Sequence, residues 1–292
     1  MTSSIGESIF EAAGILQQAG ISEARREAGS LLERVIDRDR TFIIGHAEQQ
    51  ISPEQSKTFR EFVTRRAKGE PLQYITGRQA FFGLDFKVTK DVLIPRPETE
   101  LLVETALKLA ADSQIEICDV GTGSGCIVIA LLHELPQASA VAIDVSEAAL
   151  EVARRNASRH SVADRISFVA SDCFSALTND SPQFDFIVSN PPYIATAAIQ
   201  TLQREVRDHE PRLALAAGPE GLLIIKRLLA ESSAFLKQGG YLLIEIGFDQ
   251  AAAIESMVDS ARWKLLDIHQ DLQGIPRVVA LQNVNPLSPA GR

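Results

Sequence analysis

The sequence predicts an α/β protein in which helices cover both faces of a parallel sheet. From residue 115 onward, apolar runs of strand length alternate with stretches of helical period, and Gly, Pro, Asp or Asn bounds each run. The runs are almost continuously apolar, which is typical of strands that are buried on both faces. Ligands of such sheets bind at the carboxyl ends of the strands, so we expect functional residues there.

The alternation places individual elements along the second part of the chain. Strands are expected at residues 115–120, 138–144, 166–170, 184–189 and 241–246. Helices are expected at residues 127–135, 147–160, 221–236 and 250–261. A further helix is expected to begin near Glu98, after an extended segment with prolines at positions 95 and 97.

The first 70 residues form a separate pattern of short helices. Ser4 and Glu7 have the spacing of a capping box, Ser22 can cap a second helix, and Ser52 with Gln55 begins a third. Two β-rich runs around Gly83 then predict a hairpin. We therefore expect a helical domain at residues 1–70, a β-hairpin linker at 71–95 and a larger α/β domain at 96–292.

Composition limits the class of protein. The chain has 292 residues, 45% of them hydrophobic, and a net charge of −9, which is typical of a globular protein. Its longest purely apolar run, residues 126–132, is far shorter than the roughly 20 residues that span a bilayer. The three cysteines, at positions 118, 126 and 173, match no zinc-ligand spacing. We expect a cytoplasmic protein with no bound metal and no membrane contact.

Charge is distributed unevenly along the chain. Residues 1–90 carry 13 basic and 12 acidic side chains, whereas the rest carries 16 and 26. Proteins that bind duplex nucleic acid usually present a basic face, so direct DNA binding is not expected. The basic run of the first domain is either a solvated helix face or a docking surface for an acidic or RNA-bearing partner; it consists of Lys57, Arg60, Arg65, Arg66 and Lys68.

A glycine loop follows the first predicted strand. It reads Gly121, Thr122, Gly123, Ser124 and Gly125, and the acidic Asp119 precedes it. Such a loop brings backbone N–H groups close to a ligand at the start of a helix. Its G-x-G-x-G spacing differs from the G-x-G-x-x-G of dinucleotide sites and favours S-adenosyl-L-methionine as the cofactor.

Acidic residues follow the next two strands. Asp144 ends the second strand and is expected to accept hydrogen bonds from both hydroxyls of a ribose. Its alternative role, a helix cap, is already filled by Ser146. After the third strand, Asp172 is placed to accept from an adenine amino group, with Cys173 and Phe174 beside the ring; an ordinary loop turn is the alternative.

The fourth strand ends in Asn190, Pro191, Pro192 and Tyr193. The Asn190 side-chain oxygen and the Pro191 carbonyl can accept both hydrogens of a planar amino group, and Tyr193 can stack on the attached π system. An amide or aromatic amine is a weak nucleophile, so fixed acceptors that orient it toward a methyl donor would assist transfer. Asn190 is thereby expected to contact both substrate and cofactor.

This set of motifs resembles amino-group methyltransferases, and several further stretches resemble the HemK family of protein-glutamine methyltransferases. The resemblance covers residues 69–281. Its motifs lie at 69–77, 81–86, 93–100, 205–207, 210–211, 217–222, 243–247 and 271–274. The first 68 residues match the family only in size and helical character.

The resemblance implies a fold, a substrate and residue roles. It implies a Rossmann-like class I methyltransferase sheet of seven strands, the last antiparallel, with a small helical N-terminal domain that docks the substrate. The implied substrate is the glutamine of the Gly-Gly-Gln loop in class 1 peptide chain release factors, methylated on N5 by a monomeric enzyme. The five residues 121–125 would line the cofactor and residues 190–193 would hold the amide. Relatives often have a large aromatic residue in place of Cys173, so Phe174 is an alternative adenine contact.

Two other functions use some of the same residues. An adenine-N6 or guanine-N2 nucleic-acid methyltransferase would hold its target with the same Asn-Pro-Pro-Tyr motif, but the acidic second domain disfavours it. A cofactor-binding module without catalysis would leave that motif without a role.

Overall fold

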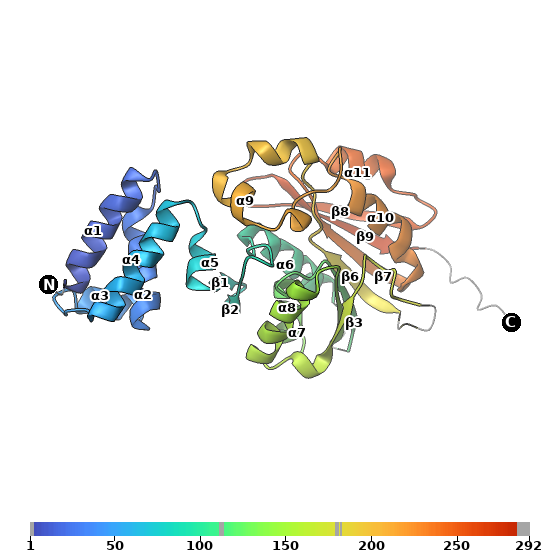
Figure 1. Ribbon diagram of the computed structural model, residues 1–292. Helices are drawn as coiled ribbons and strands as arrows, with labels where there is room; N and C mark the ends of the chain where they lie inside the picture. The colour runs from blue at the N-terminus through green and yellow to red at the C-terminus, as the bar shows by residue number, and fades with distance from the viewer. Residues whose placement is uncertain (1–2, 111–113, 179–180, 182, 285–292) are drawn as a thin grey trace. The chain divides into compact units, whose positions relative to one another are not determined.

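The computed structural model describes residues 3–110, 114–178, 181 and 183–284 (Figure 1). It divides into two compact units. The helical unit comprises Met1–Arg78 and Gln203–His209, and the sheet unit comprises Gln79–Leu202 and Glu210–Arg292. The return of residues 203–209 to the helical unit was not foreseen from the sequence, which assigned them to the domain at 96–292.

The helical unit contains a small apolar core. Its helices are α1 (Ile5–Gln18), α2 (Ala24–Ile36), α3 (Arg40–Gly45), α4 (Pro53–Ala67), α5 (Leu72–Thr76) and α9 (Arg204–His209). Buried side chains of α1, α2 and α4 meet at Leu16, Leu32 and Phe59. Helices α3 and α5 were missed because each is shorter than two turns and shows no clear apolar period.

Two of the three predicted helix starts are confirmed. Ser4 and Glu7 form a reciprocal capping box, and so do Ser52 and Gln55. The prediction that Ser22 caps α2 is wrong, because Glu23 occupies the N-cap position and makes no side-chain cap bond.

The sheet unit has a seven-stranded sheet with the order β5-β4-β3-β6-β7-β9-β8. Strands β3 (Glu116–Val120), β4 (Ser139–Asp144), β5 (Ile166–Ala170), β6 (Phe184–Ser189) and β7 (Leu236–Glu245) are parallel. Strand β9 (Pro276–Asn283) runs antiparallel to β7 and to β8 (Trp263–Gln270). This confirms the predicted seven-stranded sheet with an antiparallel last strand; the sequence alone did not locate β8 and β9.

Successive residues of the central strands face opposite sides of the sheet, as the pleat requires. On β3, Ile117 packs into one apolar cluster and Cys118 into the other; on β6, Val188 and Ile187 divide in the same way. Helices α6 (Glu100–Leu109), α7 (Cys126–Glu134) and α8 (Glu147–Arg159) contribute to the first cluster. Helices α10 (Leu223–Glu231) and α11 (Ala251–Met257) cover the other face.

A two-stranded hairpin precedes the sheet. It consists of β1 (Arg78–Phe81) and β2 (Leu84–Lys87), within the range predicted for a hairpin linker. The short 3-10 helix η1 (Pro97–Thr99) then leads into α6, so the predicted helix start near Glu98 falls at this junction. In the described ranges, no helix combines the length and apolarity needed to cross a membrane.

Candidate active site

A cavity of about 460 Å³ opens at the carboxyl ends of the parallel strands. Its lining includes the segments that follow β3, β4, β5 and β6, together with residues 91–99 and 211–224 in part. Strand β3 lies between β4 and β6, so the strand order reverses at this point. Open α/β sheets bind their ligands at such a reversal, and the cavity lies where the sequence predicts the site.

The glycine loop turns sharply between β3 and α7. Gly121, Gly123 and Gly125 all have positive φ, and the N–H groups of Gly121 and Thr122 donate to the Ile143 carbonyl of the neighbouring strand. At Gly125 a Cβ would lie 2.9 Å from the side chain of Ile129, so a larger residue cannot fit without movement. The loop is thus fixed by backbone bonds and close packing.

Asp144 is held by two backbone donors. Its Oδ2 accepts from the Gly123 N–H at 2.9 Å and its Oδ1 accepts from the Ser146 N–H at 2.9 Å. Burial raises the pKa of Asp144, while these backbone hydrogen bonds oppose that rise. Each carboxylate oxygen retains a further acceptor site, which suits two adjacent hydroxyl groups of a ribose. Ser146 caps α8, as predicted.

The three residues predicted to contact adenine, which follow β5, lie in different environments. Asp172 lines the cavity, but 63% of its side chain is exposed and its Oδ1 accepts from Arg227 at 2.6 Å. Cys173 is buried and also lines the cavity. Phe174 is absent from the lining and stacks on Phe235 in the core, with ring centroids 5.0 Å apart. Of the two alternatives for the adenine contact, the structure places Cys173 at the cavity.

Asn190 lies at the end of β6 and lines the cavity together with Pro191 and Pro192. Its Nδ2 donates to the Thr99 hydroxyl at 3.0 Å. Because the amino group is used in this way, the side-chain oxygen is the group that remains to accept from a ligand. The Pro191 carbonyl belongs to the next residue of the chain and supplies a second acceptor.

Tyr193 is mostly buried beside the cavity and is absent from its lining. Burial and the nearby Glu245 raise its pKa to about 12, so the phenol stays protonated at neutral pH. Gln250 fixes the backbone here: its Nε2 donates to the carbonyls of Tyr193, at 3.1 Å, and Gly221, at 3.0 Å. The backbone after Pro192 is therefore held by a residue that the sequence analysis did not single out.

Most of the predicted site residues meet at this cavity. Gly125, Phe174 and Tyr193 are the predicted residues that do not line it. Those that do are Gly121, Thr122, Gly123, Ser124, Asp144, Asp172, Cys173, Asn190, Pro191 and Pro192.

Two buried carboxyl groups lie close to the site. One is near the glycine loop and the other is near Tyr193. Asp119 accepts from the Thr122 hydroxyl at 2.7 Å beneath the glycine loop, and Glu245 ends β7 near Tyr193. Burial raises the pKa of each to about 7. In the part of the chain that the structure describes, Asp119 Oδ1 and Glu245 Oε2 have no hydrogen-bond partner.

These features fit S-adenosylmethionine. The cavity has the volume of a small-molecule site. The glycine loop lets a ligand approach the backbone closely, and Asp144 can hold a ribose. Among the described residues, no group of three or more His, Cys, Asp or Glu side chains could hold a metal ion.

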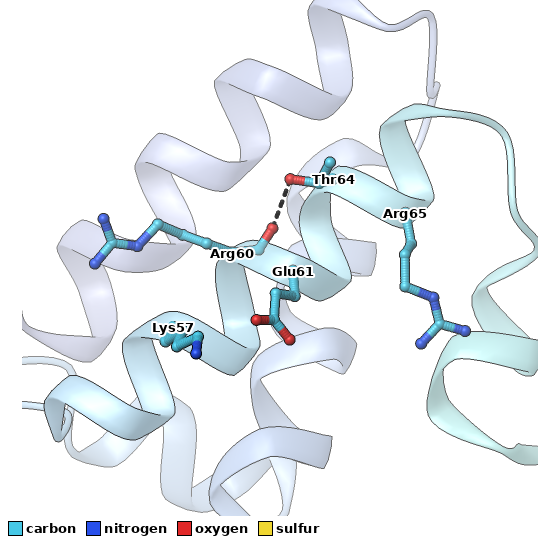
Figure 2. A pocket seen from close by; sticks show the side chains of 5 residues that line it. All are labelled: Lys57, Arg60, Glu61, Thr64 and Arg65. Carbon is cyan, nitrogen blue, oxygen red and sulfur yellow. Dashed lines mark hydrogen bonds between the residues drawn. The ribbon is translucent and has the colours of Figure 1, made fainter.

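The basic run of the helical unit is not a uniform solvated face. Figure 2 shows the side chains of Lys57, Arg60 and Arg65 on α4 with the acidic Glu61 among them, and these residues line a hollow. Arg65 pairs with Glu70 at 2.5 Å. Arg66 is only 4% exposed and pairs with two carboxylates, Glu27 and Glu205, the latter at 2.6 Å. Arg66 therefore joins α9 to the rest of this unit and is not part of a free basic surface.

Comparisons with known proteins match both parts of the chain. Residues 8–77 match the family model of the PrmC N-terminal domain, and residues 97–218 match that of the methyltransferase small domain. The first match falls on the helical unit, and the second falls on the sheet unit except for residues 203–209, which belong to the helical unit.

Full-length relatives match along nearly the whole chain. A release factor glutamine methyltransferase of Koribacter versatilis is 41% identical over 265 residues, which cover 90% of this chain and 93% of that protein. One from Geobacter sulfurreducens is 41% identical over 266 residues, covering 91% and 92%. The crystal structure of a methyltransferase from Pyrococcus furiosus is similar in fold, with a TM-score of 0.52, 19% identity and coverage of 76% and 98%.

Proposed function

The chain belongs to the family of release factor glutamine methyltransferases, and from this premise we infer its reaction and its substrate. It transfers the methyl group of S-adenosyl-L-methionine to the side-chain amide nitrogen, N5, of the glutamine in the Gly-Gly-Gln loop of class 1 peptide chain release factors. The observation that carries this inference is the position of Asn190 in one cavity with the glycine loop and Asp144.

The cofactor would bind to the part of the cavity that is lined by the glycine loop, Asp144 and Cys173. Gly121, Gly123 and the intervening loop would line the cofactor, Asp144 would accept from the ribose hydroxyls, and Cys173, which lines the cavity, would contact the adenine. When bound, S-adenosylmethionine supplies an electrophilic methyl group on a positively charged sulfur.

The substrate amide is held from the other side. Asn190 Oδ1 and the Pro191 carbonyl accept its two hydrogens, which fixes the nitrogen in line with the methyl group. Methylation of this nitrogen replaces one amide hydrogen, which is released as a proton to water. Because the amide lone pair is delocalised, orientation and electrostatic stabilisation by these acceptors supply the catalytic effect. Tyr193 follows this pair in the chain but does not line the cavity.

A protein substrate agrees with the distribution of charge. Residues 91–292 hold 16 basic and 26 acidic side chains, which is unfavourable for binding a duplex. This balance disfavours direct DNA binding, and we propose that the enzyme acts on a protein as a cytoplasmic monomer.

The reaction is tested by methyl transfer from radiolabelled S-adenosylmethionine to purified release factor, duplex DNA and ribosomal RNA. We expect label on the release factor alone, and no label when the glutamine of its Gly-Gly-Gln loop is replaced by alanine. Label on DNA or RNA, with none on the release factor, would favour a nucleic-acid amino-group methyltransferase.

The helical unit docks the whole release factor, because remote binding energy is needed to orient a weak nucleophile. Lys57 and Arg60 are exposed on α4 and available for an acidic partner. A Lys57→Glu, Arg60→Glu double variant should raise KM for release factor in a salt-dependent way, with kcat unchanged. Lys264→Glu, an exposed charge reversal on β8, is the matched control. An unchanged KM in the double variant would remove this face from the docking surface.

A further inference from the structure

The Asn190 carboxamide is oriented by a residue far away in the sequence. Thr99, the last residue of η1, lies 91 positions earlier and accepts from Asn190 Nδ2 at 3.0 Å. Thr99 is 1% exposed, so water does not compete for its hydroxyl. A hydroxyl group has a single hydrogen to donate. Once this hydrogen is donated to one neighbour, the hydroxyl oxygen can only accept from its other neighbours.

Glu245 lies near the Thr99 side chain. It is the last residue of β7 and is 2% exposed. Burial raises the pKa of Glu245 to about 7, although the Thr99 side chain, as a hydrogen-bond donor, acts to lower it. Thr99 thus lies between the carboxyl group of Glu245 and the amide of Asn190.

The positive charges near Glu245 are paired with other carboxylates. Arg277 pairs with Asp271 at 2.9 Å, and Arg96 pairs with Glu210 at 2.5 Å. Both arginines lower the pKa of Glu245, but their ion pairs are with these other carboxylates. A buried carboxylate without an ion pair is costly, and such groups are retained where they have a functional role.

The direction of the hydrogen bonds follows from these three groups. Asn190 Nδ2 donates to the Thr99 oxygen, so that oxygen accepts and the Thr99 hydrogen is left to donate. That hydrogen points to a carboxyl oxygen of Glu245, which can accept it. The Asn190 oxygen is consequently turned to the cavity. If these hydrogen bonds ran in the opposite direction, the Asn190 amino group would face the amino group of the substrate. Two hydrogen-bond donors would then oppose each other.

We propose that Thr99 and Glu245 are positioning residues for methyl transfer, and that the buried carboxylate fixes the hydrogen-bond direction so that Asn190 presents its oxygen to the substrate nitrogen. This inference rests on the proposed function. It assigns roles to Thr99 and Glu245, two residues that lie in family motifs but had no individual role from the sequence. Neither residue contacts the reacting atoms; both act through Asn190.

Three variants of the full chain separate positioning from simple support of the fold. Thr99→Val keeps the shape and removes the hydroxyl, whereas Thr99→Ser keeps the hydroxyl. Glu245→Gln adds a donor that can reverse the hydrogen bond to Thr99. We expect Thr99→Val and Glu245→Gln to lower kcat by about tenfold to a hundredfold, since small misplacements of reacting groups have effects of this size. Thr99→Ser should stay within about threefold of wild type, because it retains the hydrogen-bonding group.

Thr105→Val is the matched control. Thr105 is another buried threonine on α6, and its hydroxyl donates to the Leu101 carbonyl at 2.7 Å, away from the cavity lining. Its replacement should leave kcat unchanged. Calorimetry with S-adenosylmethionine should give the same Kd for every variant as for wild type, which shows that each is folded.

A second measurement reports the orientation directly. The side-chain amide signals of Asn190 in a ¹⁵N–¹H spectrum, identified by their loss in Asn190→Asp, should move in Thr99→Val and Glu245→Gln and stay in place in Thr105→Val. The proposal is overturned if Thr99→Val keeps the wild-type rate, if Thr99→Ser loses as much as Thr99→Val, or if the signals stay in place. Failure of the proposed function would differ, because wild type itself would then leave release factor unlabelled.

Discussion

On the cofactor side of the cavity, polar groups are fixed by the backbone around them. Asp144 is held by the N–H groups of Gly123 and Ser146, and the glycine loop is held by the Ile143 carbonyl. On the substrate side, Asn190 depends on a side chain, that of Thr99, which comes from another part of the chain. A substitution elsewhere cannot remove a backbone donor, whereas it can remove Thr99 or reverse its hydrogen bond.

The same contrast holds for the two buried carboxyl groups. Asp119 is bonded by Thr122, three residues along the chain, and lies beneath a loop whose shape is set locally. Glu245 acts on the site through Thr99, which reaches it only after the sheet has formed. The cofactor side should therefore tolerate distant substitutions, and the substrate side should be sensitive to them. The following predictions test this difference.

The largest effect is expected for Asn190→Ala. Its oxygen is assigned to the substrate and its amino group to Thr99, so kcat should fall by roughly 10²–10³-fold, as for loss of one preorganised hydrogen-bonding group. Affinity for S-adenosylmethionine should stay near that of wild type, because backbone groups define the cofactor side. Radiolabel transfer gives kcat and calorimetry gives Kd. A folded variant that keeps most of its rate would remove Asn190 from the reaction.

Asp144→Ala should have the opposite effect to Asn190→Ala: it should weaken cofactor binding and leave kcat nearly unchanged. It removes a carboxylate placed for the ribose, and loss of such charge-assisted hydrogen bonds costs about 1–3 kcal/mol of binding free energy. Kd for S-adenosylmethionine should rise accordingly, while kcat at saturating cofactor stays near that of wild type. If kcat fell and Kd did not change, the two sides would not be separable.

The contrast also explains which parts of the site the sequence could predict. The glycine loop, Asp144 and Ser146 lie together in the chain, so their spacing is visible in the sequence; Asn190 and the prolines form one short motif. Thr99 and Glu245 lie in motifs that mark the family resemblance, yet only the folded chain brings them together at Asn190. Gln250 likewise reaches Tyr193 across 57 residues.

The fold follows the same rule. The central parallel strands β3 and β6 are short apolar runs that the sequence predicts, because they are almost completely buried. Strand β8 alternates between buried and exposed residues at the edge of the sheet and was missed. Residues 203–209 join the helical unit through the pair of Glu205 and Arg66, which are 139 residues apart. Local patterns do not contain such pairings.

Asp119→Asn should change how stability depends on pH. Burial raises the pKa of Asp119 to about 7, so between its ordinary pKa and pH 7 the folded state keeps a proton that the unfolded chain has released. This group therefore makes the free energy of unfolding fall as pH rises through that window. The asparagine variant lacks this dependence, so its stability relative to wild type should rise by about 4 kcal/mol from pH 4 to pH 8, because the pKa shift is about three units.

Urea unfolding of the ligand-free protein at several pH values measures this difference. Thr122 can still donate to the asparagine oxygen, so the glycine loop keeps its local hydrogen bond. A constant difference between variant and wild type across this pH range would mean that Asp119 titrates in the folded protein as it does in the unfolded chain. The local support of the cofactor side would then not include a protonated carboxyl group.

The smallest effect is expected for Asp172→Ala, which compares two acidic residues on the cofactor side. Unlike Asp144, Asp172 is 63% exposed and its Oδ1 is engaged by Arg227 at 2.6 Å. A hydrogen bond from an adenine amino group to this carboxylate replaces one from water, so its loss should cost less than about 1 kcal/mol. Kd for S-adenosylmethionine, measured beside that of Asp144→Ala, should rise by less than about fivefold. Equal losses of cofactor affinity in the two variants would show that the exposure of a carboxylate does not determine how much it contributes to binding. Asp172 would then contribute as much through adenine as Asp144 contributes through the ribose.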